Sequence, residues 1–160
     1  MILTNVPVFV NCMRGFINRQ YGSLEGPCDL PVNLDQLRGR ENGPDWEETN
    51  IALQQVMNDY AGSVRNDGLL RQGLSHLRRL KEKANTIMVA GNPHELGRCL
   101  EVLNMLDIGE LVFLMARDRK ETRGLHVRPD YPFTNPVLDQ AHIIEMKDGR
   151  PVTQWRSYDG

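Results

Sequence analysis

The stretch RKETRGLHVRPDYP, residues 119–132, holds the side chains of this sequence that are best suited to chemistry. It combines arginines with the acids Glu121 and Asp130 and with His126, and it follows directly on the apolar run LNMLDIGELVFLMA. An arginine guanidinium stays charged and pairs bidentately with carboxylates and phosphates. A cluster of this composition suits three tasks: acid–base catalysis around the histidine, a grip on phosphate, or a structural clamp onto another piece of protein.

The charge balance of the cluster favours the clamp. Residues 117–131 carry five cations and three acids, a net charge of +2. The cations are Arg117, Arg119, Lys120, Arg123 and Arg128, and the acids are Asp118, Glu121 and Asp130. Much of this charge can be neutralised within the cluster, which leaves one or two cations for acids or phosphates outside it. Gly124 permits a sharp reversal of the chain, and Pro129 and Pro132 hold the following residues extended. We interpret residues 119–132, here called the strap, as a rigid polar segment suited to docking.

Sequence motifs of catalysis and cofactor binding are absent. The sequence has no GxGxxG dinucleotide fingerprint, no GxxxxGK(S/T) phosphate loop and no GxSxG nucleophile elbow. The segment HELGR has Arg98 where a zinc-binding HExxH motif would have its second histidine. We assign no catalytic, cofactor-binding or metal-ligating residue, and we expect a hydrogen-bonded structural role for His126. The remaining histidines, expected to be solvated or structural, are His76, His94 and His142.

Bulk composition is that of an ordinary globular protein. The chain has 160 residues, 40% of them hydrophobic and 25% charged, and a formal net charge of −2, which favours neither nucleic acid nor an anionic membrane. No apolar run reaches the ~20 residues that a membrane span needs, so we expect no direct membrane insertion. The segment MILTNVPVFVNCM lacks a basic region, and we expect no signal peptide. The spacing of Cys12, Cys28 and Cys99 predicts reduced thiols and a cytoplasmic protein.

Capping residues and periodicity predict three helices between residues 45 and 118. The first begins after Asp45, the second at Asn66–Asp67, and the third after Asn92 with Pro93 in its first turn. In the first helix the apolar residues near helical spacing are Ile51, Val56, Met57 and Tyr60, with Leu53 beside them. In the second they are Leu70, Leu74, Leu77 and Leu80. The third helix is apolar on more than one side, so two neighbouring helices can cover only part of it.

The segments outside the helices differ in character. Glycines and prolines interrupt residues 1–44 too often for long helices, and only VPVFV is suggested there as a short edge strand. The segment HIIEMKDGRPVTQW predicts two strands around an Asp148–Gly149 turn. The expected fold is therefore mainly α: an up-and-down three-helix bundle with an irregular N-terminal arm and a C-terminal β-hairpin. We divide it into an arm (residues 1–44), a bundle (residues 45–118) and the strap with a hairpin tail (residues 119–160), all in one structural domain.

The segment ARDRKETRGLHVRPDYP resembles the C-terminal motif of the succinate dehydrogenase/fumarate reductase flavoprotein family, which commonly shows Arg-x-Glu-Ser/Thr-Arg-Gly-x-His-x-Arg-x-Asp-Tyr-Pro. The matching residues are Arg119, Glu121, Thr122, Arg123, Gly124, His126, Arg128, Asp130, Tyr131 and Pro132. The segment LQQVMNDYAGSVRNDGLLRQGLSHLRRLKE looks like the first two C-terminal helices of the family. The segment NPHELGRCLEVLNMLDIGELVF looks like the third, especially in the branch of the family near adenylylsulfate reductases and clostridial fumarate reductases. L-aspartate oxidases carry a similar Arg-Gly-Leu-His…Asp-Tyr-Pro stretch. The resemblance covers about residues 47–156.

This resemblance implies the C-terminal accessory or docking domain of an FAD-dependent oxidoreductase, not catalytic alone. It implies FAD in the parent flavoprotein and no cofactor in this chain. The implied partner is the FAD-binding or capping domain, with an iron–sulfur subunit as a further candidate and a second copy of the chain in isolation. The third helix would supply apolar contact, and Arg123 and Arg128 would supply paired charges at the rim. The implied domain-interface motif is Arg119, Glu121, Arg123, Gly124, His126, Arg128, Asp130 and Tyr131.

Two other readings use different features of the sequence. A stand-alone helical module for protein interactions would explain the bundle without any parent enzyme. An anion or nucleic-acid binder would use the basic residues of the second helix and the strap, but the net charge of −2 and the lack of interleaved surface aromatics argue against it. The parent reaction stays open between succinate oxidation, fumarate reduction, adenylylsulfate reduction and aspartate oxidation.

Overall fold

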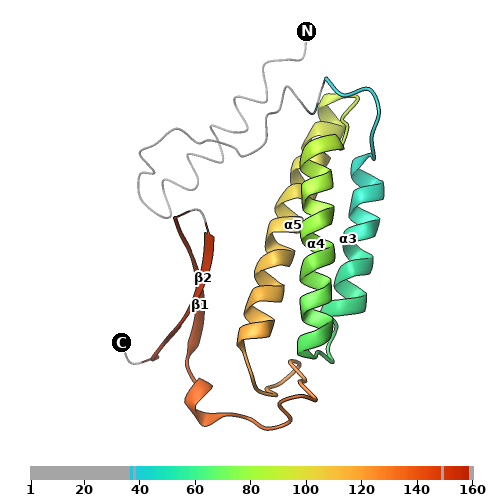
Figure 1. Ribbon diagram of the computed structural model, residues 1–160. Helices are drawn as coiled ribbons and strands as arrows, with labels where there is room; N and C mark the ends of the chain where they lie inside the picture. Colours follow the sequence, from blue (N-terminus) through green and yellow to red (C-terminus); the bar gives the residue numbers. More distant parts are fainter. Residues whose placement is uncertain (1–36, 38, 149, 159–160) are drawn as a thin grey trace. The chain divides into compact units, whose positions relative to one another are not determined.

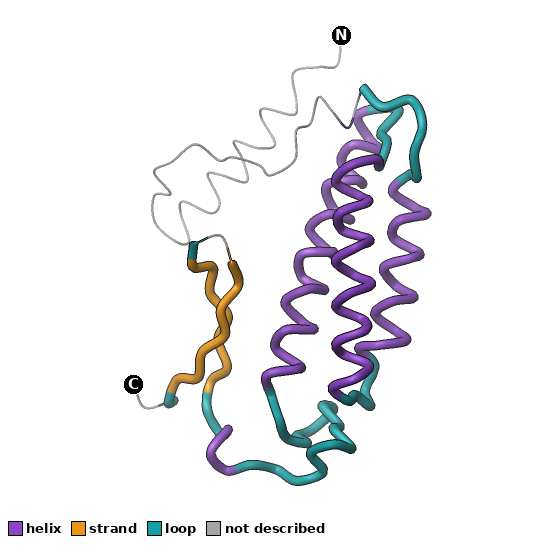
Figure 2. Tube along the Cα trace, in the orientation of Figure 1, coloured by secondary structure: helices purple, strands orange, loops and turns teal. Residues whose placement is uncertain are grey.

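In the part of the chain that the structure describes, three α-helices precede a short 3-10 helix and a two-stranded hairpin (Figure 1). The computed structural model describes residue 37, residues 39–148 and residues 150–158. The helices are α3 (Trp46–Ala61), α4 (Asp67–Ile87) and α5 (Pro93–Asp118), followed by a short 3-10 helix η1 (Pro136–Leu138) and the strands β1 (Ala141–Lys147) and β2 (Arg150–Arg156). Helices α3, α4 and α5 run side by side and each packs on the other two (Figures 1 and 2). This arrangement confirms the predicted mainly α fold with a C-terminal hairpin.

Side-chain caps fix the start of each helix where the sequence places it. The Asp45 carboxylate accepts a hydrogen bond from the Glu48 N–H at 2.7 Å, and the Asn66 side chain accepts one from the Leu69 N–H at 2.8 Å. Asn92 does the same for the Glu95 N–H at 2.9 Å. Each cap satisfies an N–H group that has no partner within the helix, which is why the three predicted starts are confirmed.

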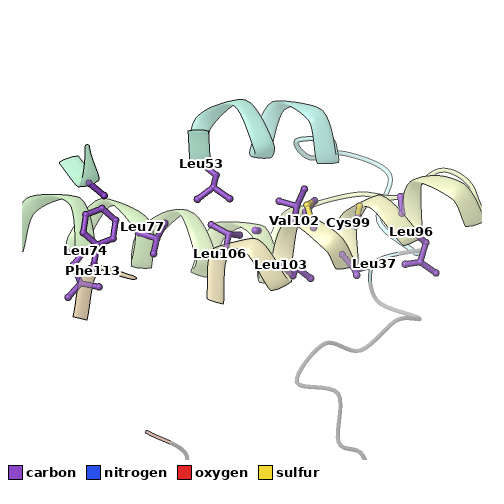
Figure 3. Close-up of a cluster of buried hydrophobic side chains, with 14 of the residues drawn as sticks. Leu37, Leu53, Leu74, Leu77, Leu96, Cys99, Val102, Leu103, Leu106 and Phe113 are labelled. Atoms are coloured by element: carbon purple, nitrogen blue, oxygen red, sulfur yellow. The ribbon is translucent and has the colours of Figure 1, made fainter. Parts of the chain in front are cut away.

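The core lies between the three helices (Figure 3). Helix α4 buries Leu70, Leu74 and Leu77, as its spacing predicts, and Leu80 packs on the core while partly exposed. Helix α3 differs from the expectation in one respect: Leu53 is 4% exposed and lies in the core, whereas Ile51 is 58% exposed. From α5 the buried side chains are Leu96, Cys99, Val102, Leu103, Leu106, Phe113 and Ala116.

The last residues of the predicted arm cover the C-terminal end of α4. Leu37 is fully buried in the core, and its carbonyl oxygen accepts a hydrogen bond from the Ala90 N–H. The Arg40 guanidinium donates to the carbonyl oxygens of Met88 and Asn85, each at 2.8 Å, which satisfies acceptors at a helix end. Residues 1–36 lie outside the described residues, and with them the suggested VPVFV strand, Cys12 and Cys28. Cys99 is a buried free thiol, and burial raises its pKa to about 11, so it stays protonated.

The C-terminal hairpin pairs β1 with β2 antiparallel, in a register from Ala141 opposite Arg156 to Lys147 opposite Arg150. Asp148 takes a φ of 51°, the left-handed conformation that a tight hairpin turn requires. The hairpin contacts the end of α5 through His142, whose Nε2 lies 2.7 Å from the Asp118 carboxylate. None of the helices in the described part of the chain is long and apolar enough to span a membrane.

Candidate functional site

Arg128, in the strap, is fully buried, and its guanidinium binds the end of α5. One terminal nitrogen, Nη1, donates to the carbonyl oxygens of Ala116 at 2.8 Å and Arg119 at 3.4 Å. The other two nitrogens form a bidentate pair with Asp130, from Nε to Oδ1 at 2.8 Å and from Nη2 to Oδ2 at 2.6 Å. The C-terminal end of a helix carries partial negative charge, so the cation is favourably placed there. Arg128 therefore joins the strap to α5 and is not available to an outside anion.

Asp130 connects the same pair to the start of α4. Its Oδ2 accepts a hydrogen bond from the Asp67 backbone N–H at 3.0 Å, in the first turn of that helix. The helix N-terminus carries partial positive charge and unpaired N–H groups, which favour a carboxylate. The hydrogen bonds from Arg128 lower the pKa of Asp130 to about 2, although burial opposes them. One ion pair therefore bridges the end of α5 and the beginning of α4.

Glu121 is the second fully buried charge of the strap. Its Oε1 accepts hydrogen bonds from Arg119 and from the Arg123 Nε, the latter at 2.9 Å, and its Oε2 accepts one from the Asn135 N–H at 2.8 Å. Burial alone would raise the pKa of Glu121, but these hydrogen bonds outweigh it and lower the pKa. Arg123 also pairs with Asp139 at 3.2 Å. Both arginines are thus paired with carboxylates of this chain.

His126 links the strap to the loop between α3 and α4. Its Nδ1 lies 3.0 Å from the Arg65 Nη1 and its Nε2 lies 3.1 Å from the Arg119 carbonyl oxygen. A guanidinium can only donate and a carbonyl can only accept, so these partners assign a neutral imidazole with its proton on Nε2. Burial lowers the pKa of His126, and nearby arginines lower it further against the opposing hydrogen bond to Arg119. This is the hydrogen-bonded position expected for His126.

The remaining motif residues shape the strap. Gly124 has a φ of 56° in the tight turn that the mutual backbone hydrogen bonds between Arg123 and His126 close, as the need for a chain reversal predicts. The Tyr131 ring lies 5.0 Å from the Arg128 guanidinium carbon, within the range of a cation–π contact. The structure thus brings all eight proposed motif residues into one connected network.

Three residues that were not included in the proposed interface motif complete this network. The Thr122 hydroxyl accepts from the Arg128 N–H at 2.9 Å and lies 3.0 Å from the Tyr131 carbonyl oxygen. Arg65 and Asp67 supply partners from the α3–α4 loop and α4. Asp67 could have been found as the acidic first residue of a helix, but nothing in the sequence shows that Val64 forms a β-bridge with Val127 beside Arg65.

The site offers little to a substrate. Among the described residues no group of three histidine, cysteine or acidic side chains could hold a metal ion. The strap cations Arg119, Arg123 and Arg128 already have carboxylate partners. The neutral His126 has both ring nitrogens occupied. The arrangement can fix two helix ends, a loop and the strap in one geometry, which is the work of a clamp.

The family model described as fumarate reductase flavoprotein C-term matches residues 50–155, and the chain belongs to this family. It is the C-terminal domain of flavoproteins of the fumarate reductase and succinate dehydrogenase type.

Two relatives match most of this chain but only a small part of their own length. The chain is 26% identical over 130 residues to an uncharacterised FAD-dependent oxidoreductase of Methanocaldococcus jannaschii, in a match that covers 81% of this chain and 24% of that protein. It is 27% identical over 133 residues to the fumarate reductase flavoprotein subunit of Haemophilus influenzae, covering 79% of this chain and 22% of the relative.

A solved structure shares the fold. Adenylylsulfate reductase from Archaeoglobus fulgidus superposes with a TM-score of 0.68 at 24% sequence identity, over 72% of this chain and 20% of that one. The chain therefore spans about a quarter or less of the length of the proteins it resembles.

Proposed function

We propose that this chain is an accessory docking domain of an FAD-dependent oxidoreductase and has no catalytic activity alone. Its partner is the FAD-binding or capping domain of the parent flavoprotein, and an iron–sulfur subunit is a further candidate. The observation that carries the proposal is the internal pairing of the strap: two fully buried charges, Arg128 and Glu121, use their hydrogen bonds on this chain's own groups. Such a cluster holds a shape and leaves no acid or base poised for a substrate.

The share of the relatives that is covered supports the same proposal. The match to each curated relative takes up between 22% and 24% of that protein. FAD belongs to the parent flavoprotein in this proposal, and the chain itself binds none. The motif Arg119, Glu121, Arg123, Gly124, His126, Arg128, Asp130 and Tyr131 stands at the domain interface, where it sets the angle at which the hairpin leaves the bundle. The proposal does not choose between succinate, fumarate, adenylylsulfate and aspartate as the parent substrate.

Flavin binding and turnover test the catalytic half of the proposal. FAD is titrated into the purified 160-residue chain while flavin fluorescence and tryptophan fluorescence are followed, and the chain is assayed with succinate and an artificial electron acceptor. We expect no saturable change and no turnover. Retained stoichiometric FAD, or succinate oxidation by the isolated chain, would contradict the proposal.

The identity of a co-purified partner tests the docking half. We expect an affinity-tagged chain, expressed in its own cells, to co-purify with a protein that carries FAD, which denaturation of the eluate releases in stoichiometric amount. A stand-alone helical interaction module, the alternative, would co-purify with partners that contain no flavin.

A further inference from the structure

We propose that the groove between α4 and α5 around Arg117 is the electrostatic contact of this domain and receives carboxylate side chains of an acidic protein surface. This inference rests on the proposed docking function and names the face and the chemistry that it would use. It adds a second set of arginines to the interface, because Arg123 and Arg128 of the strap, which were expected to serve an outside partner, are paired with carboxylates of this chain.

The arginines of the strap are paired with carboxylates of the chain, whereas the side chains that line this groove keep a positive charge. A cavity of about 430 Å³ is lined by Arg71, Leu74, Ser75, Arg78, Arg79, Glu82 and Arg117. Four of these residues are arginines and one is an acid, so the lining side chains sum to +3. Neighbouring carboxylates reduce this value. Glu110 lies 2.8 Å from the Arg78 Nε and also binds Lys81 at 2.8 Å, but Lys81 has Asp107 as a second partner at 2.7 Å, so Arg78 counts as paired.

Arg79 bonds the His76 Nδ1 at 2.9 Å and has no carboxylate partner among the described residues, and Arg117 likewise has no carboxylate at hydrogen-bond distance. The Arg117 Nε is buried and has no hydrogen-bond partner among the residues that the structure describes. The acid within reach is Asp67, whose Oδ1 lies 3.8 Å from that nitrogen, too far for a hydrogen bond. Asp67 also forms an ion pair with Arg71, so one carboxylate serves two guanidiniums. An incoming carboxylate would pair with the exposed part of the Arg117 side chain, which is 37% exposed, while the buried Nε keeps Asp67 as its nearest acid.

The shape and composition of the groove favour an acidic protein surface over other anions. Arginine presents a planar fork that matches a carboxylate bidentately, and arginine tolerates an interface better than the more strongly hydrated lysine. Leu74 gives the groove an apolar side for the stem of a glutamate. Single-stranded nucleic acid would call for aromatic side chains on which bases stack, and the residues that line this groove include none.

A peptide titration followed by NMR tests the groove in the full 160-residue chain. Hexaglutamate is added at low ionic strength, where exposed charges act over the longest distance. We expect backbone amide shifts to change at Arg71, Ser75 and Arg117. Arg117→Gln should weaken binding roughly two- to fivefold, the range for one exposed charge pair. Arg71→Gln, whose side chain is 67% exposed, should do the same without any effect on packing.

Arg98→Gln is the matched control, because it also removes one positive charge from a half-exposed arginine of α5, at the other end of the helix. Equal weakening by Arg98→Gln and Arg117→Gln would show that only net charge matters and would overturn the proposal, as would the absence of shifts in the groove. Tighter binding of a uridine decanucleotide at the same residues would overturn it in favour of nucleic acid. The FAD titration on the same sample tests the proposed function separately. If the chain bound both FAD and hexaglutamate, the proposal of a non-catalytic accessory domain would be refuted, whereas the proposal of the acid-binding groove would stand.

Discussion

Arg128 is the largest fully buried side chain among the described residues, and its charge makes it costly to leave without partners. Arg128→Met keeps much of the volume but removes the partner of Asp130 and of the carbonyl oxygens at the end of α5. We expect a loss of about 3–5 kcal/mol in the free energy of unfolding, measured by urea denaturation, which is the usual cost of breaking a buried pair. Arg71→Gln breaks an exposed pair and should cost less than about 1 kcal/mol. Similar losses in the two variants would mean that the buried pair stabilises the fold no more than an exposed pair does.

His126 makes stability depend on pH, and the sign follows from its lowered pKa. In the unfolded chain the imidazole titrates near pH 6.5, while in the fold burial and the positive charges of Arg65, Arg128 and Arg119 hold it neutral to lower pH. Below pH 6.5 the unfolded state binds more protons, so the contribution of His126 is full above that pH and is lost as the pH falls towards the lowered pKa. We expect the urea concentration at the midpoint of unfolding to decrease when the pH is lowered from 7.5 to 5.5.

The variant His126→Gln isolates this contribution, because glutamine can also accept from Arg65 and donate to the Arg119 carbonyl oxygen but does not titrate. Its urea midpoint should fall less between the two pH values than that of the native chain. The acids of the clamp do not interfere, because the pKa values of Glu121 and Asp130 are lowered, that of Asp130 to about 2. An unchanged pH dependence in the variant would remove His126 as its source.

At the scale of elements, a close contact of α4 with α3 and α5 depends on Gly73. A Cβ at this position would lie 2.4 Å from the Tyr60 Cβ and 2.5 Å from a Phe113 ring carbon, so α3 and α5 would both have to shift. Gly73→Ala should therefore destabilise the chain by about 1–3 kcal/mol in urea denaturation, despite the better helix propensity of alanine. Gly97→Ala in α5, where nothing lies within 4 Å, should instead stabilise it by up to about 1 kcal/mol. Stabilisation by both substitutions would show that the helices have room to move apart.

The elements themselves were predictable to different degrees from the sequence. Helix starts depend on a cap and the residues just after it, and so Asn66 and Asn92 could be recognised without any tertiary structure. The sequence does not show which side of α3 faces the core, because Ile51 and Leu53 are both apolar and only packing against the other helices distinguishes them. The structure buries Leu53 and leaves Ile51 exposed. The hairpin followed from its Asp148–Gly149 turn signal.

Pairing inside the clamp was not predictable in the same way. The sequence shows the charges of the strap but not the loop geometry that aims Arg128 at the Ala116 carbonyl oxygen and Asp130 at the first turn of α4. Thr122 matches the Ser/Thr position of the family motif, but the sequence does not show that its hydroxyl contacts two strap residues. Contacts of this kind depend on how segments far apart in the chain meet, and spacing along the sequence does not record that.

For the molecule as a whole, the second apolar side of α5 is the feature that a missing partner would explain. Met105, Ile108, Val112 and Met115 recur at helical spacing outside the core formed with α3 and α4. Ala141, His142 and Tyr158 of the C-terminal segment line one groove with Ile108, Val112 and Met115. This cover is partial, because Met105 remains 40% and Ile108 59% exposed. A continuous apolar row of this kind is a place where protein surfaces meet.

The isolated chain should therefore self-associate through α5, and the location of Ile108 allows a matched test. Ile51 on α3 is 58% exposed, almost the same as Ile108, but it belongs to no such row. In sedimentation velocity the native chain should show a sedimentation coefficient that rises with concentration. Ile108→Arg should shift the association to at least about tenfold higher concentration, because a charge in an apolar contact costs more than 1.4 kcal/mol unless it is paired. Ile51→Arg should leave the association unchanged, since an exposed isoleucine outside any interface loses nothing on becoming polar. If both variants associated like the native chain, the row on α5 would not be an interface, and the apolar half of the docking proposal would lose its physical basis.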